Sequence, residues 1–275
     1  MDLTSVFNKD LFKDKVVFIT GGGSGINLGI AKNFAQLGAN IGICGRTQEK
    51  LDNAAKELEA LGAKVVAKSA DVRDADALSA SMEATKAALG PIDVLVCGAA
   101  GNFPCPAEAL SPNGFKSVID IDLLGSFNSC RMAVEQLKET RGSILFISAG
   151  QAFIPYAMQA HVGAAKAGID NMMQNLALEW GKYGIRCNSI APGPIEGTEG
   201  AARLEPANVA KQMDKLIPLQ RHGTVDDIGQ IAVFLASPLA SYITGTVLVA
   251  DGGQNLLGSA IYTELVLKEM AGGGD

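Results

Sequence analysis

Close to the amino terminus stands the stretch that decides the fold, Thr20-Gly21-Gly22-Gly23-Ser24-Gly25-Ile26-Asn27-Leu28-Gly29. A β-branched run at residues 15–20 precedes it, and apolar residues recur at helical spacing over residues 28–37. Glycines at such a strand-to-helix turn let the backbone approach a pyrophosphate, and the helix N-terminus offers N–H groups. We therefore predict a dinucleotide-binding turn, with a tight structural turn as the alternative. The residues expected to face the phosphates are Gly21, Ser24, Gly25 and Ile26.

Strand-like and helix-like segments alternate through the rest of the chain. Strands are expected at residues 15–20, 39–44, 63–69, 92–97, 143–147, 186–190 and 246–249. Helices are expected at residues 28–37, 48–61, 75–89, 112–140, 162–183 and 225–236. Because continuously apolar strands need cover on both faces, this alternation predicts an α/β fold: one doubly wound parallel (Rossmann) sheet with helices on both faces.

The domain organisation expected from the sequence is simple. No repeat or linker divides residues 1–275, so a single NADP-binding reductase domain is expected. Residues 196–219 have little strand character and several polar side chains, and are the expected substrate lid.

Composition excludes several classes of function. The 275 residues are 48% hydrophobic and 19% charged, which indicates a globular protein. A net charge of −6 argues against nucleic acid as the main partner. The five cysteines and two histidines lack zinc-ligand spacing, so reduced core thiols and no metal are expected.

Targeting signals are equally absent from the sequence. No apolar run reaches the ~18 residues of a membrane span, and the amino-terminal residues lack the apolar stretch of a signal peptide. The last residues form no Ser-Lys-Leu type peroxisomal address. A cytoplasmic protein without a membrane span is therefore expected.

The end of the second expected strand indicates which cofactor binds. It reads Cys44-Gly45-Arg46-Thr47, where an NAD-specific site would place a carboxylate for the ribose 2′-OH. Arg46 suits a 2′-phosphate instead, so NADP(H) is predicted; a solvated arginine at a helix start is the alternative. The ends of the third and fourth strands supply the residues expected at the adenine and at the ribose or nicotinamide: Asp71, Val72, Ala99 and Ala100.

With these features, residues 13–253 resemble the short-chain dehydrogenase/reductase family. The resemblance rests on the glycine-rich turn, Asp71-Val72, the Ala99-Ala100-Gly101 loop, Lys166 on a helix, Pro192-Gly193 and Val249-Ala250-Asp251-Gly252-Gly253. It implies further cofactor contacts from Pro192, Gly193, Ile195 and Lys166.

That family usually works through Asn, Ser, Tyr and Lys, and this chain departs from the pattern at three positions. Val162 stands four residues before Lys166, where the tyrosine is expected. Ala149 stands at the serine position and Asp122 at the asparagine position. Valine cannot transfer a proton, which excludes ordinary alcohol–ketone chemistry through a tyrosine. A site that keeps the cofactor residues but has lost the side chain that would protonate a carbonyl oxygen favours reduction of an activated C=C bond.

One branch of the family, the 2,4-dienoyl-CoA reductases and particularly the peroxisomal type, is similar in several stretches. Among them are Ala99-Ala100-Gly101-Asn102-Phe103-Pro104-Cys105-Pro106, Asp120-Ile121-Asp122 and Gln159-Ala160-His161-Val162-Gly163-Ala164-Ala165-Lys166. The resemblance implies that Asp122 orders a water for protonation and that Lys166 holds the cofactor ribose. It implies acyl-CoA contacts from Arg73, Phe103, Ser111, Asn113 and Arg203, and a homotetramer built through helices near residues 111–140 and 162–183.

Several alternatives stay open. The main hypothesis is NADPH-dependent reduction of 2,4-dienoyl-CoA thioesters in unsaturated fatty-acid degradation. Another activated alkene or acyl thioester is the second, and a catalytically dead NADP-binding scaffold is the third. Asp122 could instead be a helix-surface aspartate, His161 could contact the ligand or simply pack, and Tyr156 could be a spare donor to an enolate.

Overall fold

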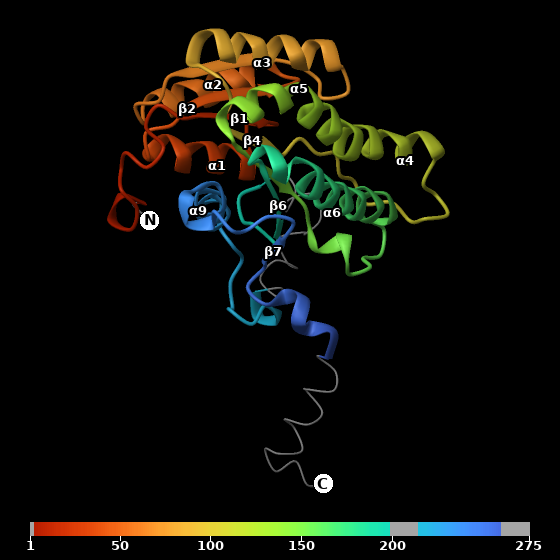
Figure 1. Ribbon diagram of the computed structural model, residues 1–275. Coiled ribbons are helices and arrows are strands. Elements are labelled where there is room, and N and C mark those ends of the chain that lie inside the picture. The colour runs from red at the N-terminus through yellow and green to blue at the C-terminus, as the bar shows by residue number, and fades with distance from the viewer. Residues whose placement is uncertain (1–2, 199–213, 260–275) are drawn as a thin grey trace, which may run out of the picture.

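A parallel sheet of seven strands forms the centre of the protein (Figure 1). The computed structural model describes residues 3–198 and 214–259. The strands are β1 Val16–Thr20, β2 Asn40–Gly45, β3 Val65–Ser69, β4 Val94–Cys97, β5 Ser143–Ile147, β6 Arg186–Pro192 and β7 Val247–Ala250. Their order is β3-β2-β1-β4-β5-β6-β7, so the chain reverses direction across the sheet between β1 and β4. Ligands of such sheets bind at the carboxyl ends of the strands beside this reversal.

Helices cover both faces of the sheet, which confirms the doubly wound α/β fold. One face carries α1 Gly25–Gln36, α2 Gln48–Glu59 and α9 Val225–Ala236. The other carries α3 Ala75–Leu89, α5 Gly125–Thr140 and α6 Ala160–Trp180. Side chains of a strand alternate between faces, so Val17 and Ile19 of β1 contact the first layer and Phe18 the second. All three are apolar because neither face meets water.

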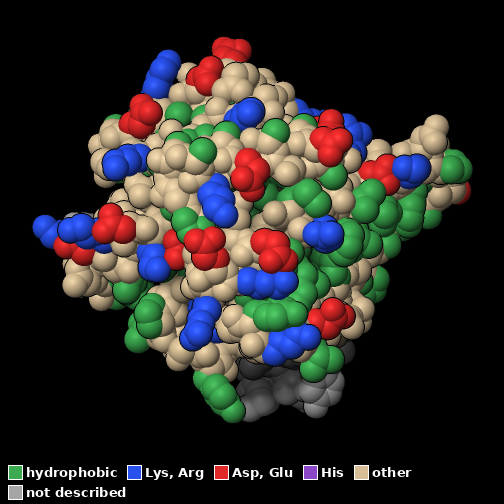
Figure 2. Space-filling model, turned by 45° about the horizontal axis from the view of Figure 1, so that its top comes forward, with side chains coloured by type: hydrophobic (Ala, Val, Ile, Leu, Met, Phe, Trp, Pro, Cys, Tyr) green, Lys and Arg blue, Asp and Glu red, His purple; other side chains and the backbone are tan. Residues whose placement is uncertain are grey.

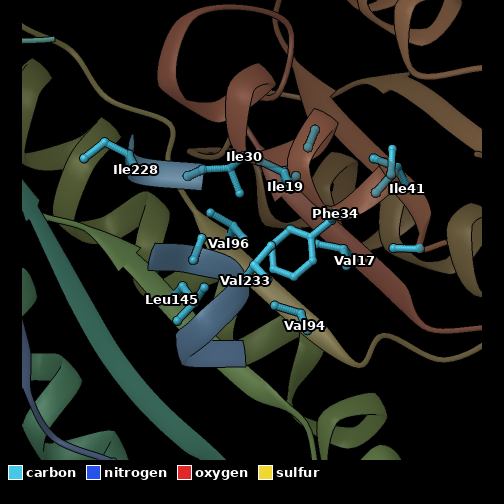
Figure 3. Packing of buried hydrophobic residues seen from close by; sticks show 14 of the residues in the cluster. Val17, Ile19, Ile30, Phe34, Ile41, Val94, Val96, Leu145, Ile228 and Val233 are labelled. Carbon is cyan, nitrogen blue, oxygen red and sulfur yellow. The ribbon is translucent and has the colours of Figure 1, made fainter. Parts of the chain in front are cut away.

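The first helical layer packs closely because two glycines lie where α1 and α9 meet. A Cβ on Gly29 would lie 2.5 Å from the Cβ of Val225, and one on Gly229 would lie 2.4 Å from Asn33 Nδ2. Figure 3 shows Phe34 of α1 between side chains of β1 and α9, with Val17 and Val233 beside it. This packing fixes α1, whose amino terminus faces the carboxyl end of β1.

The expected helix at residues 112–140 contains a π-helical turn. It consists of α4 Pro112–Val118, a π-helical turn at Ile119–Leu124, and α5. π-helical turns widen a helix by one residue and occur frequently at functional sites. Here the turn brings Asp122 to the inside, fully buried, while Asp120 stays near the surface and pairs with Lys116. The helical character expected at residues 112–140 is therefore confirmed over the whole range, and the π turn within it was not predicted.

Two further observations concern the distribution of surface charge and the length and polarity of the helices. On the face shown in Figure 2, basic and acidic side chains are interspersed rather than gathered by sign. Among the described residues, no helix is both long enough and apolar enough to cross a membrane.

Candidate active site

A cleft of about 420 Å³ opens at the carboxyl ends of β1, β2, β3, β4 and β5. It collects residues that the sequence placed at a cofactor: Gly21, Ser24, Gly25, Ile26, Arg46, Asp71, Val72, Ala99, Ala100 and Lys166. Three other predicted cofactor residues are not among the residues that line the cleft: Pro192, which ends β6, and Gly193 and Ile195, which follow it. Ile195 is 3% exposed and lines a second cavity together with Pro194 and Gly223.

The glycine-rich turn has the backbone that a phosphate site needs. Gly21 and Gly25 have φ values of 72° and 58°, a region that residues with a Cβ rarely adopt. Ser24 precedes α1 without making a side-chain cap, so the first N–H groups of the helix are left for a ligand. The turn therefore fits the anionic part of a dinucleotide.

The two arginines at this end of the sheet lie in different environments. Arg46 follows β2 at the rim of the cleft and makes no side-chain hydrogen bond within the described part of the chain. Arg73 instead donates to Asp71 from Nε at 3.0 Å and from a terminal nitrogen at 2.6 Å. These hydrogen bonds, more than the charge of Arg46, hold the pKa of Asp71 below its usual range. Asp71 is therefore ionised at neutral pH.

A buried ion pair joins Lys166, which lines the cleft, to Asp122, which is not among the lining residues. Lys166 Nζ lies 3.1 Å from Asp122 Oδ2, and the side chains are 8% and 0% exposed. The N–H of Gly101 donates to Asp122 Oδ1 at 2.7 Å, and Lys166 donates to the carbonyl of Ile147 at 2.9 Å. The alternative of a surface position for Asp122 is wrong. The structure thus joins the two predicted catalytic residues, from a π turn and from α6.

Hydroxyl groups are missing where Val162 and Ala149 stand, and a second carboxylate lies nearby. Val162 is 2% exposed in an apolar cluster. Ser148 donates to Asp170 Oδ2 at 2.8 Å, and burial raises the pKa of Asp170 against the opposing hydrogen bonds and the Lys166 charge. This pair was not predicted from the sequence. Its signal was the spacing, because Asp170 lies four residues after Lys166 and so on the same helical face.

Three of the residues predicted to contact an acyl-CoA, Phe103, Ser111 and Asn113, lie at or beside α4. Phe103 packs on the ring of His161 with centroids 4.5 Å apart. His161 is fully buried, and within the described residues neither ring nitrogen has a hydrogen-bond partner. Ser111 caps α4 by accepting from the Gly114 N–H at 3.0 Å.

Four further predictions concern exposed positions or positions outside the described residues. Asn113 is exposed on α4, and Tyr156 is 37% exposed on the loop before α6. Arg203 and most of the predicted lid at residues 196–219 lie outside the described residues.

The cysteines and other potential metal ligands do not gather into a centre. All five cysteines are free, and burial raises the pKa of Cys44 and Cys187 to about 12. Cys97 and Cys130 lie in contact, with 3.9 Å between their sulfurs. Within residues 3–198 and 214–259, no group of three or more His, Cys, Asp or Glu side chains could hold a metal ion.

This fold and cleft define a class of protein, the dinucleotide-binding reductases built on a Rossmann sheet. Residues 21–255 match the family model described as enoyl-(acyl carrier protein) reductase, and the chain belongs to the short-chain dehydrogenase/reductase family. It therefore uses a nicotinamide cofactor.

Individual relatives are similar over almost the whole chain. A peroxisomal 2,4-dienoyl-CoA reductase of Saccharomyces cerevisiae is 45% identical over 269 residues, covering 95% of this chain and 92% of the relative. A Bacillus subtilis protein named probable 2,4-dienoyl-CoA reductase is 43% identical, covering 87% of this chain and 96% of that one.

Solved structures are similar as well. A short chain dehydrogenase from Bacillus anthracis superposes with a TM-score of 0.82 at 43% identity, covering 89% of this chain and 97% of that one. Levodione reductase superposes with a TM-score of 0.85 at 31% identity, covering 89% of this chain and 99% of that one.

Proposed function

We propose that this chain is an NADPH-dependent reductase of a conjugated C=C bond in 2,4-dienoyl-CoA thioesters, acting in unsaturated fatty-acid degradation. The observation that carries the proposal is the buried Asp122–Lys166 pair in a site where Val162 and Ala149 replace the groups that would protonate a carbonyl. The yeast and Bacillus relatives are both named 2,4-dienoyl-CoA reductases, which supports this substrate class, although their names give different products, (3E)-enoyl-CoA and (2E)-enoyl-CoA.

Lys166 is suited to orient the cofactor. An ammonium group has three N–H donors. One donates to Ile147 O and a second faces Asp122, at 2.9 Å and 3.1 Å. The third is left for a ribose hydroxyl, and Lys166 lines the cleft where that ribose would lie. When bound there, the reduced nicotinamide supplies a hydride.

Asp122 is suited to organise the proton that follows. Addition of a hydride to a dienoyl thioester leaves a dienolate, which must be protonated at carbon. The Gly101 N–H and the Lys166 ammonium keep the carboxylate of Asp122 in one orientation. In that orientation it can accept a hydrogen bond from a water and hold this water over the dienolate. The ammonium also favours the negative charge of the dienolate.

The reaction is tested by the loss of NADPH absorbance with hexa-2,4-dienoyl-CoA, against a simple ketone in a parallel assay. Turnover of the dienoyl thioester alone supports the proposal. Turnover of a different conjugated thioester or alkene, with none of the dienoyl-CoA, supports the second hypothesis. Tight NADPH binding without turnover of any of these compounds leaves a catalytically dead NADP-binding scaffold.

The preference for NADP(H) rests on Arg46. Its guanidinium lies at the rim of the cleft, free of side-chain hydrogen bonds within the described residues, where it can bind a 2′-phosphate bidentately. The acyl-CoA phosphates need local cations as well, because the chain carries a net charge of −6. Arg73, Phe103, Ser111, Asn113 and Arg203 are the residues proposed to contact that substrate.

A homo-oligomer, specifically a tetramer, is also part of the proposal. Large apolar side chains stand exposed on the helices named for the interface, including Phe127 of α5 at 46% and Leu178 of α6 at 84%. Light scattering on an eluting column peak measures the mass directly. A monomeric mass would contradict this part of the proposal.

The domain organisation and the cellular location belong to the proposal too. We take residues 1–275 as one domain, with a substrate lid near residues 196–219. The expected location is the cytoplasm, whereas several relatives are named as peroxisomal. Microscopy of the chain with an amino-terminal fluorescent tag tests this, and overlap with a peroxisomal marker would overturn it.

A further inference from the structure

The space above Gly98 is occupied by a side chain from another element. A Cβ built on Gly98 would lie 2.0 Å from Oδ1 and 2.5 Å from Cγ of Asn27. Real Cβ atoms do not approach other heavy atoms so closely, so Gly98 can have no side chain while Asn27 is in place. Asn27 stands on α1, and Gly98 directly follows β4. The side chain of Asn27, which comes from α1, thus occupies the space that a side chain on residue 98 would need.

The amide group of Asn27 joins two backbone segments. Its Nδ2 donates to the carbonyl of Gly98 at 2.8 Å and to the carbonyl of Gly21 at 3.2 Å. Since both partners are acceptors, the orientation of the amide is determined by its contacts. Gly21 begins the phosphate turn, so this one side chain ties that turn to the loop after β4.

The start of the loop after β4 is also held by Thr20. Thr20 Oγ1 accepts from the N–H groups of Gly98 and Ala99 at 3.1 Å and 3.2 Å. Further along, the Gly101 N–H donates to Asp122. Residues 98–101 therefore run from Asn27 to the buried ion pair, along the wall of the cleft. A shift at Gly98 would be transmitted to Asp122 through only three residues.

We propose that Asn27 is a positioning residue that sets the 98–101 loop against the phosphate turn, and so aligns the cofactor with Asp122. The proposal rests on the proposed reductase function. It predicts that loss of the Asn27 amide, which itself lines the cleft, lowers both cofactor affinity and turnover. A purely structural role in helix packing would lower thermal stability and leave the kinetic constants of the folded enzyme unchanged.

Two substitutions test whether the effect of Asn27 comes from its hydrogen-bond donor or from the shape of its side chain. Asn27→Asp keeps the shape but places a carboxylate against two carbonyl oxygens, and Asn27→Ala removes the group. Both are expected to raise the Kd of NADPH and to lower kcat by on the order of tenfold each. Lys32→Ala, on the same helix but paired with Glu57 away from the cleft, is the control and should change neither. Unchanged Kd and kcat in folded Asn27→Asp would overturn the proposal.

The exchange of the two residues is the sharper experiment. Asn27→Gly empties the space above Gly98, and the double variant Asn27→Gly/Gly98→Asn refills it from the strand side. Both variants carry the same glycine in α1, so its cost to the helix cancels in the comparison. We expect the double variant to recover at least about threefold in NADPH affinity and in kcat over Asn27→Gly. No recovery in a folded double variant would contradict the proposal.

The cofactor readout keeps this test independent of the substrate. NADPH binding is measured by protein fluorescence without any thioester present. If the unmodified protein reduces no dienoyl-CoA, the proposed function fails, while the Asn27 variants still report on NADPH binding. If the unmodified protein is active and the variants bind and turn over normally, the role of Asn27 fails alone.

Discussion

Lys166 Nζ lies 3.1 Å from Asp122 Oδ2, with both side chains almost fully removed from water. An ion pair in such a place is costly to desolvate, and removal of one partner leaves the other charge buried without compensation. Mutation of either residue is therefore expected to affect both catalysis and the free energy of unfolding. Variants must separate a loss of catalysis from a loss of folding.

Asp122→Asn should lower kcat by at least ~10²-fold, because it removes the carboxylate that is proposed to hold the protonating water. NADPH should still bind, since its phosphates lie at the glycine-rich turn. The matched control is Asp120→Asn, which changes an aspartate two residues away that pairs with Lys116 near the surface. Near-normal turnover in Asp122→Asn would remove Asp122 from the mechanism and favour Tyr156 or an unassisted water.

Lys166→Met should lower the free energy of unfolding by roughly 3–5 kcal/mol, because Asp122 is then buried without its cation. The double variant Asp122→Asn/Lys166→Met should regain much of that stability and remain inactive. Urea unfolding followed by circular dichroism measures both variants. A Lys166→Met protein as stable as the unmodified one would mean that the pair contributes little to folding.

Arg46→Asp should weaken NADPH binding by on the order of 2 kcal/mol, through lost charge-assisted hydrogen bonds and new repulsion of the 2′-phosphate. NADH binding should change far less. Arg131→Ala, an exposed arginine on α5, serves as the control. Equal use of NADH and NADPH by the unmodified protein would show that the interpretation of Arg46 is wrong.

Arg73→Ala should raise the KM for the CoA thioester by on the order of tenfold and leave the KM for NADPH nearly unchanged. The side chain is 43% exposed and reaches solvent beside Asp71, so a CoA phosphate can approach it. The effect should shrink as salt is added. A KM for the thioester that does not move would place Arg73 outside the substrate site.

Asp170→Asn should stabilise the protein at neutral pH. Burial raises the folded-state pKa of Asp170 above 3.8, so its ionisation above that folded pKa costs stability. Below the unfolded value the carboxyl is protonated in both states and the cost disappears. The gain from Asp170→Asn should therefore fall as pH is lowered through this window, measured by urea unfolding at several pH values. A gain that grows toward acid would contradict the assignment.

The positions of the cleft residues relative to the strands explain which of them could be predicted from the sequence. The phosphate turn, Arg46, Asp71 and Ala99 each directly follow a strand, and parallel strands end at one edge of the sheet. Their meeting in one cleft follows from that topology. Pro192 ends β6, and Gly193 and Ile195 follow it; these three predicted cofactor residues lie outside the cleft lining.

The amino-acid sequence by itself determined the alternation of buried strands and helices, the glycine-rich turn, and the loss of the tyrosine and serine at Val162 and Ala149. These are local properties, written in spacing and residue type. Only the tertiary structure decided that Asp122 turns inward at a π turn, that Asp170 meets Ser148, and that Asn27 fills the space above Gly98. The contacts of all three side chains depend on how the helices pack on the sheet; the spacing from Lys166 indicates the helical face of Asp170 but not its contact with Ser148.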